Sequence, residues 1–437
     1  MENRNKNIFQ QIKWSFVFKA LAFIVYYISI SYQIKILGAE LYGVWATLLS
    51  IVTWVVFFDF GLGNGIKNYL TKALAKNNIE EAKEIIMTGY IAIAIISIAL
   101  FLLVFFLAST VDLKALFNTE LLSNQQLKYI VITLFGFVFL HFIISFVKQF
   151  IFAIQKNALN EFEQLLFYSL LMGALYFIYV QQYKSIFSIV IAYGLALIIG
   201  KSILTLIFFS KNRHLLPSFK NFKKKIMGKL MNVGMTFFAL QLVYIFILLS
   251  DKMIITQLLG PSEVTSYDIV YRVMSVILVF HGVVNAPMWS AYTEAYNKHD
   301  TQWIKNNLKK MNYFIIILIF IAGILSFFYK EIIELWIGEE LHIEPSLVYA
   351  MAVYVIVVSW NNNHAFFVNS INKIKWQLYA YSVGAVINIP LSIYFARSMN
   401  LGSLGVVLAT IISLFIFSIV GFIQTRMILS NSYAENK

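Results

Sequence analysis

The sequence predicts an all-α integral membrane protein with about twelve transmembrane helices, arranged as two six-helix halves. Of its 437 residues, 60% are hydrophobic and only 13% are charged, whereas a soluble domain carries roughly a quarter charged residues. Apolar runs long enough to cross a bilayer recur along the whole chain. They are longer than the roughly ten alternating residues of a barrel strand, so helices are the remaining way to satisfy the backbone in hydrocarbon.

The expected helices are apolar segments joined by loops that are too short to hold a soluble domain. Their limits are 14–37, 42–66, 85–109, 125–151, 160–181, 185–210, 230–259, 265–293, 311–336, 346–370, 374–397 and 402–428.

The basic residues orient these helices, because cytoplasmic loops carry an excess of Lys and Arg. With the N-terminus inside, most of the 34 basic residues fall in the inner segments. The outer segments hold Lys35, Lys114, Lys128, Lys184, Lys330 and Arg397. We therefore expect both termini in the cytoplasm. The net charge of +13 is interpreted as a topology signal, and no nucleic-acid partner is expected.

The densest basic run divides the chain into an N-terminal half (1–212), a basic cytoplasmic linker (213–229) and a C-terminal half (230–437). The linker is interpreted as a solvated segment that also touches anionic lipid headgroups. LGAELYGVW (37–45) and LGPSEVTSY (259–267) lie at matching outer turns, each after the first long helix of its half. The repeat predicts halves of equal orientation, related by an axis along the membrane normal, with a cavity between them.

The sequence disfavours several kinds of site. It contains no cysteine, which excludes disulfides and cysteine-ligated metals. It has no segment with the features of a cleaved signal peptide, and no GxxxxGK[ST] loop for binding ATP. We expect no catalytic residue, no metal and no cofactor.

The two halves, the Leu-Gly turns and the stretch DFGLGNGIKNYL (59–70) together resemble the polysaccharide transporter family, the Wzx-type flippases of O-antigen and capsule repeat units. That family belongs to the MOP superfamily, which also contains the multidrug and toxin extruders. The order and spacing of two stretches carry the resemblance over essentially the whole chain: LGAELYGVWATLLSIVTWVVFFDFGLGNG and SDKMIITQLLGPSEVTSYDIVYRV. The resemblance implies a V-shaped, MATE-like architecture and alternating access.

The resemblance also implies a substrate, a location and partners. The substrate would be an oligosaccharide repeat unit on undecaprenyl pyrophosphate, moved from the cytoplasmic to the outer leaflet of a bacterial inner membrane for lipopolysaccharide or capsule synthesis. Coupling to H⁺ or Na⁺ is an expected feature. Membrane lipids, and the polymerase and chain-length proteins of the same pathway, are the expected partners.

The hairpin DKMIITQLLGPSEVTSYDIVYR (251–272) brings charges into apolar runs, where charge is costly and often functional. One reading is a structural lock, in which Asp251 pairs with Arg272 and Lys252 with Asp268. In the other reading these residues line the cavity: Lys252 or Arg272 attracts the pyrophosphate, and Asp251 binds a coupling cation or a proton. The matching positions of the first half carry no charge, which favours the cavity reading.

Other charges within or beside the spans have the same two readings. Lys19 and Lys201 are candidate bases for pyrophosphate, or they extend to the membrane interface. Asp59 and Glu294 are candidates for cation coupling or for ion pairs. The glycines that follow Asp59 favour close helix packing or a bend during gating.

A set of polar residues in the second half gives candidates for cavity lining and gating. His281 could relay protons or form an interhelical hydrogen bond, and Pro287 is expected to kink its helix. Consecutive amides cannot all face lipid cheaply, so part of the run at 361–364 should face protein or water and suits sugar hydroxyls. The full set is His281, Asn285, Pro287, Asn361, Asn362, Asn363 and His364.

Two competing functions remain open. A MATE-type exporter of organic cations or drugs would share the fold, but it would need a negative cavity, whereas pyrophosphate needs a positive one. A membrane glycosyltransferase, polymerase or ligase typically carries a large outer loop. The outer loops here are short, and the acidic segment 330–344 is expected to form an amphipathic interfacial segment.

Overall fold

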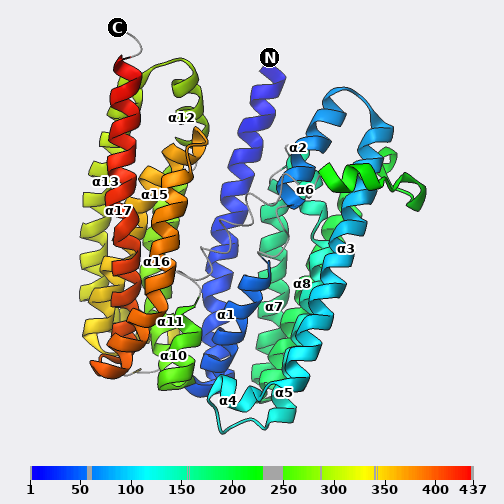
Figure 1. Cartoon of the computed structure of the whole chain (residues 1–437). Coiled ribbons are helices and arrows are strands. Elements are labelled where there is room, and N and C mark those ends of the chain that lie inside the picture. Colours follow the sequence, from blue (N-terminus) through cyan, green and yellow to red (C-terminus); the bar gives the residue numbers. More distant parts are fainter. Residues whose placement is uncertain are drawn as a thin grey trace. The chain divides into compact units, whose positions relative to one another are not determined.

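The computed structural model describes residues 2–56, 62–154, 156, 158–229, 250–285, 288–338, 341 and 343–434, and their regular structure is helical (Figure 1). In these residues, nine helices are long and apolar enough to cross a membrane. The chain separates into two compact units, unit 1 of residues 1–241 and unit 2 of residues 242–437. The all-α membrane class predicted from the sequence is confirmed. The limits of the linker, 213–229, stay a prediction.

Unit 1 is a bundle in which α7 packs against α1 and α8, and α5 against α3 and α8. Ser123 begins α5 with a capping box, in which its side chain and that of Gln126 each accept a hydrogen bond from the other's backbone N–H. The helices are α1 (Glu2–Val56), α2 (Leu62–Ala75), α3 (Ile79–Thr110), α4 (Leu113–Phe117), α5 (Asn124–Ile144), α6 (Val147–Ala153), α7 (Ala158–Val180), α8 (Ile186–Lys211), η2 (Arg213–Leu215) and η3 (Phe219–Asn221).

Unit 2 is built around α15, which packs against α11, α13 and α17, while α16 packs along α17. Asp300 caps the start of α13 by accepting the N–H of Trp303. The helices are α10 (Asp251–Leu259), α11 (Pro261–Asn285), α12 (Met288–Asn297), α13 (Thr301–Phe327), α14 (Tyr329–Ile337), α15 (Pro345–Ser370), α16 (Lys375–Ile393), η4 (Tyr394–Ser398) and α17 (Gly402–Ala434).

The two Leu-Gly turns adopt the same backbone conformation. Gly38 lies inside α1 with φ 70° and ψ 175°, and Gly260 lies between α10 and α11 with φ 95° and ψ 162°. A positive φ with ψ near 180° is accessible almost only to glycine. No heavy atom lies within 4 Å of a Cβ added at either position, so a larger side chain would have room there. The glycine is needed because of the backbone conformation. The turns therefore match in geometry as well as in sequence.

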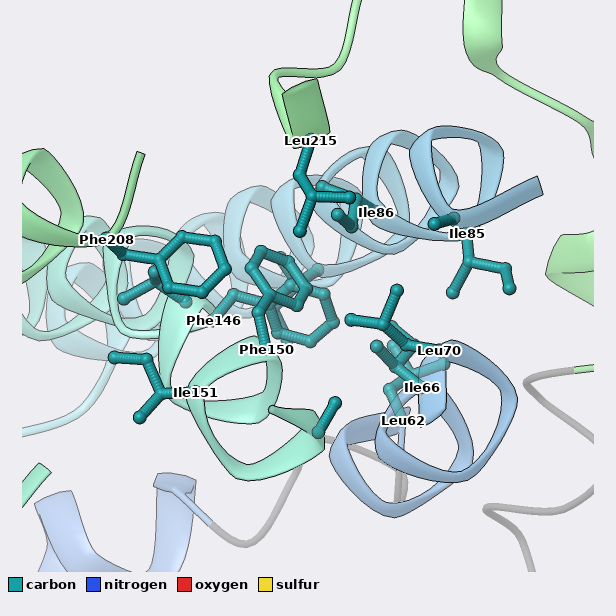
Figure 2. Close-up of a cluster of buried hydrophobic side chains, with 14 of the residues drawn as sticks. Leu62, Ile66, Leu70, Ile85, Ile86, Phe146, Phe150, Ile151, Phe208 and Leu215 are labelled. Carbon is teal, nitrogen blue, oxygen red and sulfur yellow. The ribbon is translucent and has the colours of Figure 1, made fainter. Parts of the chain in front are cut away.

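An apolar core closes one end of unit 1 (Figure 2). It joins the start of α3 to α2, α6, the end of α8 and η2, and the ring of Phe150 packs against those of Phe146 and Phe208. Unit 2 has a comparable core, in which Tyr292, Phe367 and Leu429 join α12, α15 and the end of α17. The chain segments at these cores carry many of the basic residues assigned to the inner side.

Several predicted spans differ from the observed helices, and most of the span 230–259 lies outside the described residues. The break predicted between the spans 14–37 and 42–66 is present as a kink at Gly38, whose backbone is not helical. The span 42–66 is described as far as Val56 and again from Leu62, where α2 begins. The span 311–336 is divided: α13 begins earlier, at its Asp300 cap, and ends at Phe327. The amphipathic segment expected at 330–344 begins as α14, which buries Ile333 and Ile337 and leaves Leu335 90% exposed.

Candidate functional site

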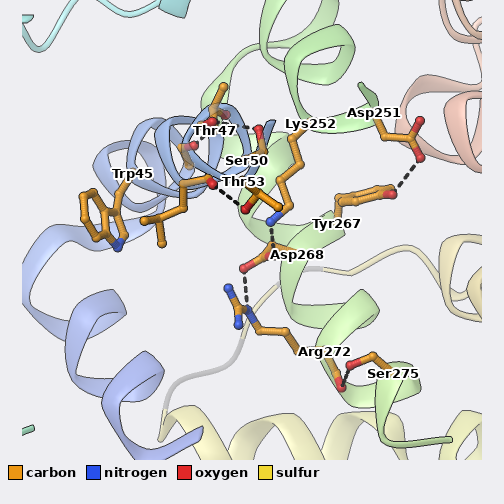
Figure 3. A network of polar contacts seen from close by, with 12 residues as sticks. Trp45, Thr47, Ser50, Thr53, Asp251, Lys252, Tyr267, Asp268, Arg272 and Ser275 are labelled. Carbon is orange, nitrogen blue, oxygen red and sulfur yellow. Dashed lines mark hydrogen bonds and ion pairs between the residues drawn. The ribbon is translucent and has the colours of Figure 1, made fainter. Parts of the chain in front are cut away.

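The charged hairpin is formed by α10 and α11, which pack against each other on either side of Gly260. Lys252 Nζ lies 2.5 Å from Asp268 Oδ1, and Arg272 Nε lies 2.6 Å from Asp268 Oδ2. The two bases reach the carboxylate from opposite sides (Figure 3). The Asp268 side chain is 1% exposed, that of Arg272 10% and that of Lys252 19%. Lys252 therefore occupies the exposed edge of this Lys252–Asp268–Arg272 triad.

The observed ion pairs differ from the predicted pairs in one respect. The bond between Lys252 and Asp268 forms as predicted, but Arg272 pairs with Asp268 where the sequence had suggested Asp251. Asp268 and Arg272 are four residues apart on α11 and so lie on the same helix face. The predicted pairs all crossed the hairpin, so this contact within α11 was missed.

Asp251 belongs to a separate polar cluster of unit 2. Tyr267 Oη donates to Asp251 Oδ2 at 2.8 Å, and Thr410 Oγ1 lies 3.0 Å from Asp251 Oδ1. Asn388 Nδ2 in turn donates to Thr410 Oγ1 at 3.0 Å. The carboxyl is buried, and no basic side chain pairs with it in the described part of the chain. It is therefore a buried acid held by neutral donors from α11 and α17.

One of the two readings of the sequence had Lys201 extend to the membrane interface, and the structure does not show this. Lys201 is buried on α8 and pairs with Glu163 of α7. Gly200 leaves room for this pair, since a Cβ there would lie 3.3 Å from Glu163 Oε1. Asn160, one turn before Glu163, is also buried, and neither atom of its amide has a hydrogen-bond partner among the described residues.

Glu163 and Tyr267 are site residues that the sequence reasoning missed. All in-span bases had been counted, but of the acids outside the hairpin only Asp59 and Glu294 had been considered. The same count applied to Asp and Glu would have found Glu163 inside the predicted span 160–181. Tyr267 carried no comparable signal, because tyrosine is frequent throughout this chain.

The remaining charged candidates are at the surface or outside the described residues. Lys19 is exposed on α1, as both of its readings require. Glu294 is exposed on α12, where Lys298 Nζ lies 2.5 Å away, and this hydrogen bond holds the pKa of the Glu294 carboxyl below its usual range. Asp59 and Pro287 lie outside the residues that the structure describes.

The polar run of α15 joins the helices of unit 2. His281 Nε2 lies 2.8 Å from Asn363 Oδ1, so the interhelical hydrogen bond, one of the two readings of His281, is present. Asn363 Nδ2 donates to the carbonyl of Met311 on α13 at 3.1 Å, and Asn361 Nδ2 to that of Leu414 on α17 at 2.9 Å. His364 also contacts α17, because its Nδ1 lies 3.2 Å from Thr425 Oγ1.

Asn285 and Asn362 are not tied into this network. Asn285 is fully buried at the end of α11, and its amide atoms have no hydrogen-bond partner in the part of the chain that the structure describes. Asn362 is only half-buried on α15. Of the consecutive amides, Asn362 is thus the one with a side chain accessible to a ligand.

The comparisons with known proteins agree on a family. The family model described as polysaccharide biosynthesis protein matches residues 8–293, and that described as MatE matches residues 236–394. A protein of Salmonella typhimurium (strain LT2), named as an O-antigen transporter, is 26% identical over 422 residues and covers 92% of each chain. A protein of Yersinia pseudotuberculosis, named as an O-antigen export protein, is 25% identical over 406 residues and covers 90% of each chain.

Solved structures share the fold. The inward-facing conformation of a multidrug resistance MATE family transporter of the MOP superfamily matches with a TM-score of 0.80 at 14% identity, over 95% of each chain. At this identity the likeness establishes the architecture alone. The first family model covers well over half of the sequence. This multi-pass membrane protein therefore belongs to the polysaccharide biosynthesis protein family.

Proposed function

We propose that the protein translocates lipid-linked oligosaccharide repeat units from the cytoplasmic to the outer leaflet of a bacterial inner membrane, by alternating access, for O-antigen or capsule synthesis. The observation that carries this proposal is the Lys252–Asp268–Arg272 triad. Two bases on one carboxylate are an expensive arrangement within a membrane protein, and apolar residues would pack there at lower cost. An anionic ligand gives this arrangement a use. The two O-antigen proteins that match over about nine-tenths of the chain support it.

The proposed topology has twelve spans and cytoplasmic termini. Within each unit, basic residues gather on the segments around one terminal core, such as Lys72 and Lys211 in unit 1 and Lys305 and Lys373 in unit 2. The positive-inside rule assigns such ends to the cytoplasm. The pathway's polymerase and chain-length proteins would receive the repeat unit on the other side.

Asp268 acts in this proposal as an internal substitute for the substrate's phosphate. It holds Lys252 and Arg272 in place until a pyrophosphate oxygen takes over one of the bonds. Lys252 exchanges first, because its side chain is the more exposed of the two bases. Arg272 then offers the planar fork that suits two phosphate oxygens. The half-buried Asn362 is a candidate to contact sugar hydroxyls.

The test of this function is glycan export in cells that lack the endogenous gene. Lys252→Ala and Arg272→Ala should each lower surface glycan roughly tenfold or more, the effect of losing one hydrogen bond to a charged group. Arg272→Lys should retain more export than Arg272→Ala. The matched control is Lys298→Ala, which removes an exposed base outside the triad. Immunoblots of membranes confirm equal amounts of each variant, and unchanged export in both alanine variants would refute the assignment.

A transport assay in vesicles distinguishes the proposed function from export of organic cations by the same fold. In vesicles that contain the purified protein, a cationic dye should not be transported, whereas a fluorescent lipid-linked oligosaccharide should become accessible on the opposite leaflet. Dye transport without glycan transport would identify the protein as an exporter of organic cations.

Asp251 is the residue that we propose for coupling to H⁺ or Na⁺. Its buried carboxyl receives bonds from neutral donors, so a cation or proton can neutralise it there. Asp251→Asn keeps the shape but removes the charge. In vesicles, an imposed proton or sodium gradient should accelerate transport by the unmodified protein and by the exposed-site control Glu294→Gln, but not by Asp251→Asn. A gradient response that persists in Asp251→Asn would exclude this coupling site.

A further inference from the structure

The basic segment 211–229 is a folded part of unit 1. Leu215 of η2 is buried in the apolar core beside Ile86 and Phe150 (Figure 2). Ser218 forms a capping box with Asn221 around η3. These local contacts give the segment a defined surface.

Three polar contacts attach this segment to α3. Asn221 Nδ2 donates to Glu80 Oε1 at 2.7 Å. The backbone N–H of Lys223 donates to Thr88 Oγ1 at 3.1 Å, and Lys223 Nζ lies 3.4 Å from Glu84 Oε1. These contacts fix the segment against α3, and its exposed side chains that make none of them are called its outward side below.

The outward side combines apolar and basic groups. Phe219 is 81% exposed and Leu216 51% exposed, although both lie beyond the last residue of the membrane helix α8. Lys220, Lys224 and Lys225 of the same segment are also exposed, and the sequence from 211 to 229 contains no acidic residue. A large aromatic ring left in water is unfavourable, whereas aromatic rings at the level of lipid headgroups are favoured.

We propose that this outward side docks onto anionic phospholipid headgroups of the adjacent leaflet, with Phe219 inserted into the interface and the lysines on the lipid phosphates. The charge is complementary, and the segment follows directly from the end of a membrane helix. Basic residues next to a membrane helix bind anionic lipid in this way, and each strengthens binding roughly fivefold. The aromatic ring supplies the apolar contact that a purely solvated linker would lack.

The test uses the natural absence of cysteine from this chain. Phe219→Cys in the full-length protein gives a single site for a nitroxide spin label that is itself apolar. The labelled protein is placed in nanodiscs of phosphatidylcholine alone or with phosphatidylglycerol. Collision rates with oxygen, which concentrates in the bilayer, and with a water-soluble nickel chelate report the depth of the label. A label at Lys76→Cys, an exposed site in the turn between α2 and α3, is the control.

In anionic nanodiscs the label at position 219 should be accessible to oxygen and shielded from the chelate. In neutral nanodiscs, and in the variant K220Q/K224Q/K225Q, it should shift toward the chelate. The docked-to-undocked ratio should fall roughly fivefold for each lysine removed. The variant K35Q/K184Q/K330Q makes the same change of charge at exposed sites elsewhere and should leave the label docked. Equal thermal unfolding of the two triple variants confirms that both are folded.

Three outcomes would overturn the proposal. A label that is open to the chelate in both kinds of nanodisc means that the segment does not contact lipid. Equal shielding in both kinds means apolar insertion without recognition of charge. Shielding that requires added cytoplasmic extract means that a protein, not the lipid surface, covers this side.

Discussion

Asp268→Ala should lower the free energy of unfolding by about 3–5 kcal/mol, as expected when one member of a buried ion pair is removed. The change deletes the carboxylate that Lys252 and Arg272 both contact, and it leaves both positive charges at a site where Asp268 itself is 1% exposed. Chemical unfolding of the purified protein in mixed micelles measures the loss. The matched control is Glu294→Ala, which removes the acid of an exposed pair and should change stability very little.

A triple variant separates the structural role of the triad from its role in transport. Asp268→Leu with Lys252→Met and Arg272→Leu replaces the charges by apolar groups of similar size. Such replacements of buried ion pairs are often neutral or stabilising, so stability should return to that of the unmodified protein. Glycan export should remain lost, because no base is left for the pyrophosphate. A triple variant that is both stable and active would show that the triad is only a lock.

The sequence predicted the membrane class and the matching turns because both depend on local signals. Apolar runs reflect the length of a bilayer-spanning helix, and a Leu-Gly turn shows where the backbone needs a positive φ, as at Gly38 and Gly260. The limits of individual helices were harder to predict. The polar start of α13, for example, extends that helix beyond its apolar run.

The partners of the charged residues were only partly predictable. Lys252 and Asp268 had been matched correctly from their depths on the two arms of the hairpin. The partner of Arg272 depended on a choice between two carboxylates, Asp251 and Asp268, within reach of the same helix. Depth along a helix does not resolve that choice, because it also depends on the direction in which each side chain projects.

The polar run at 361–364 illustrates the same limit. The sequence required some of these amides to avoid lipid, and Asn361 and Asn363 do so by bonding to the backbones of α17 and α13. A helix that places consecutive polar residues on different faces can join two neighbours at once. Which faces meet neighbours is a property of tertiary packing. The assignment of Asn362 to the accessible face therefore required the structure.

The buried pair of Glu163 and Lys201 leads to the second large effect. Glu163→Ala and Lys201→Ala should each lower the free energy of unfolding by about 3–5 kcal/mol, because each leaves the other charge buried between α7 and α8. Gly200→Ala should act in the same direction but more weakly, since its Cβ would press on the Glu163 carboxylate from 3.3 Å. Unfolding of each variant in mixed micelles gives the order of the effects.

The double variant Glu163→Met with Lys201→Met decides whether Lys201 also binds substrate. Two apolar side chains of similar length fill the site without charge, so the protein should recover its stability. If the pair only joins α7 to α8, glycan export should recover with stability. If Lys201 leaves Glu163 to bind the pyrophosphate, the variant should be stable but should export little glycan, as Lys252→Ala is expected to do. We expect recovery of export, because Lys201 lacks the exposed edge through which Lys252 can exchange Asp268 for a phosphate.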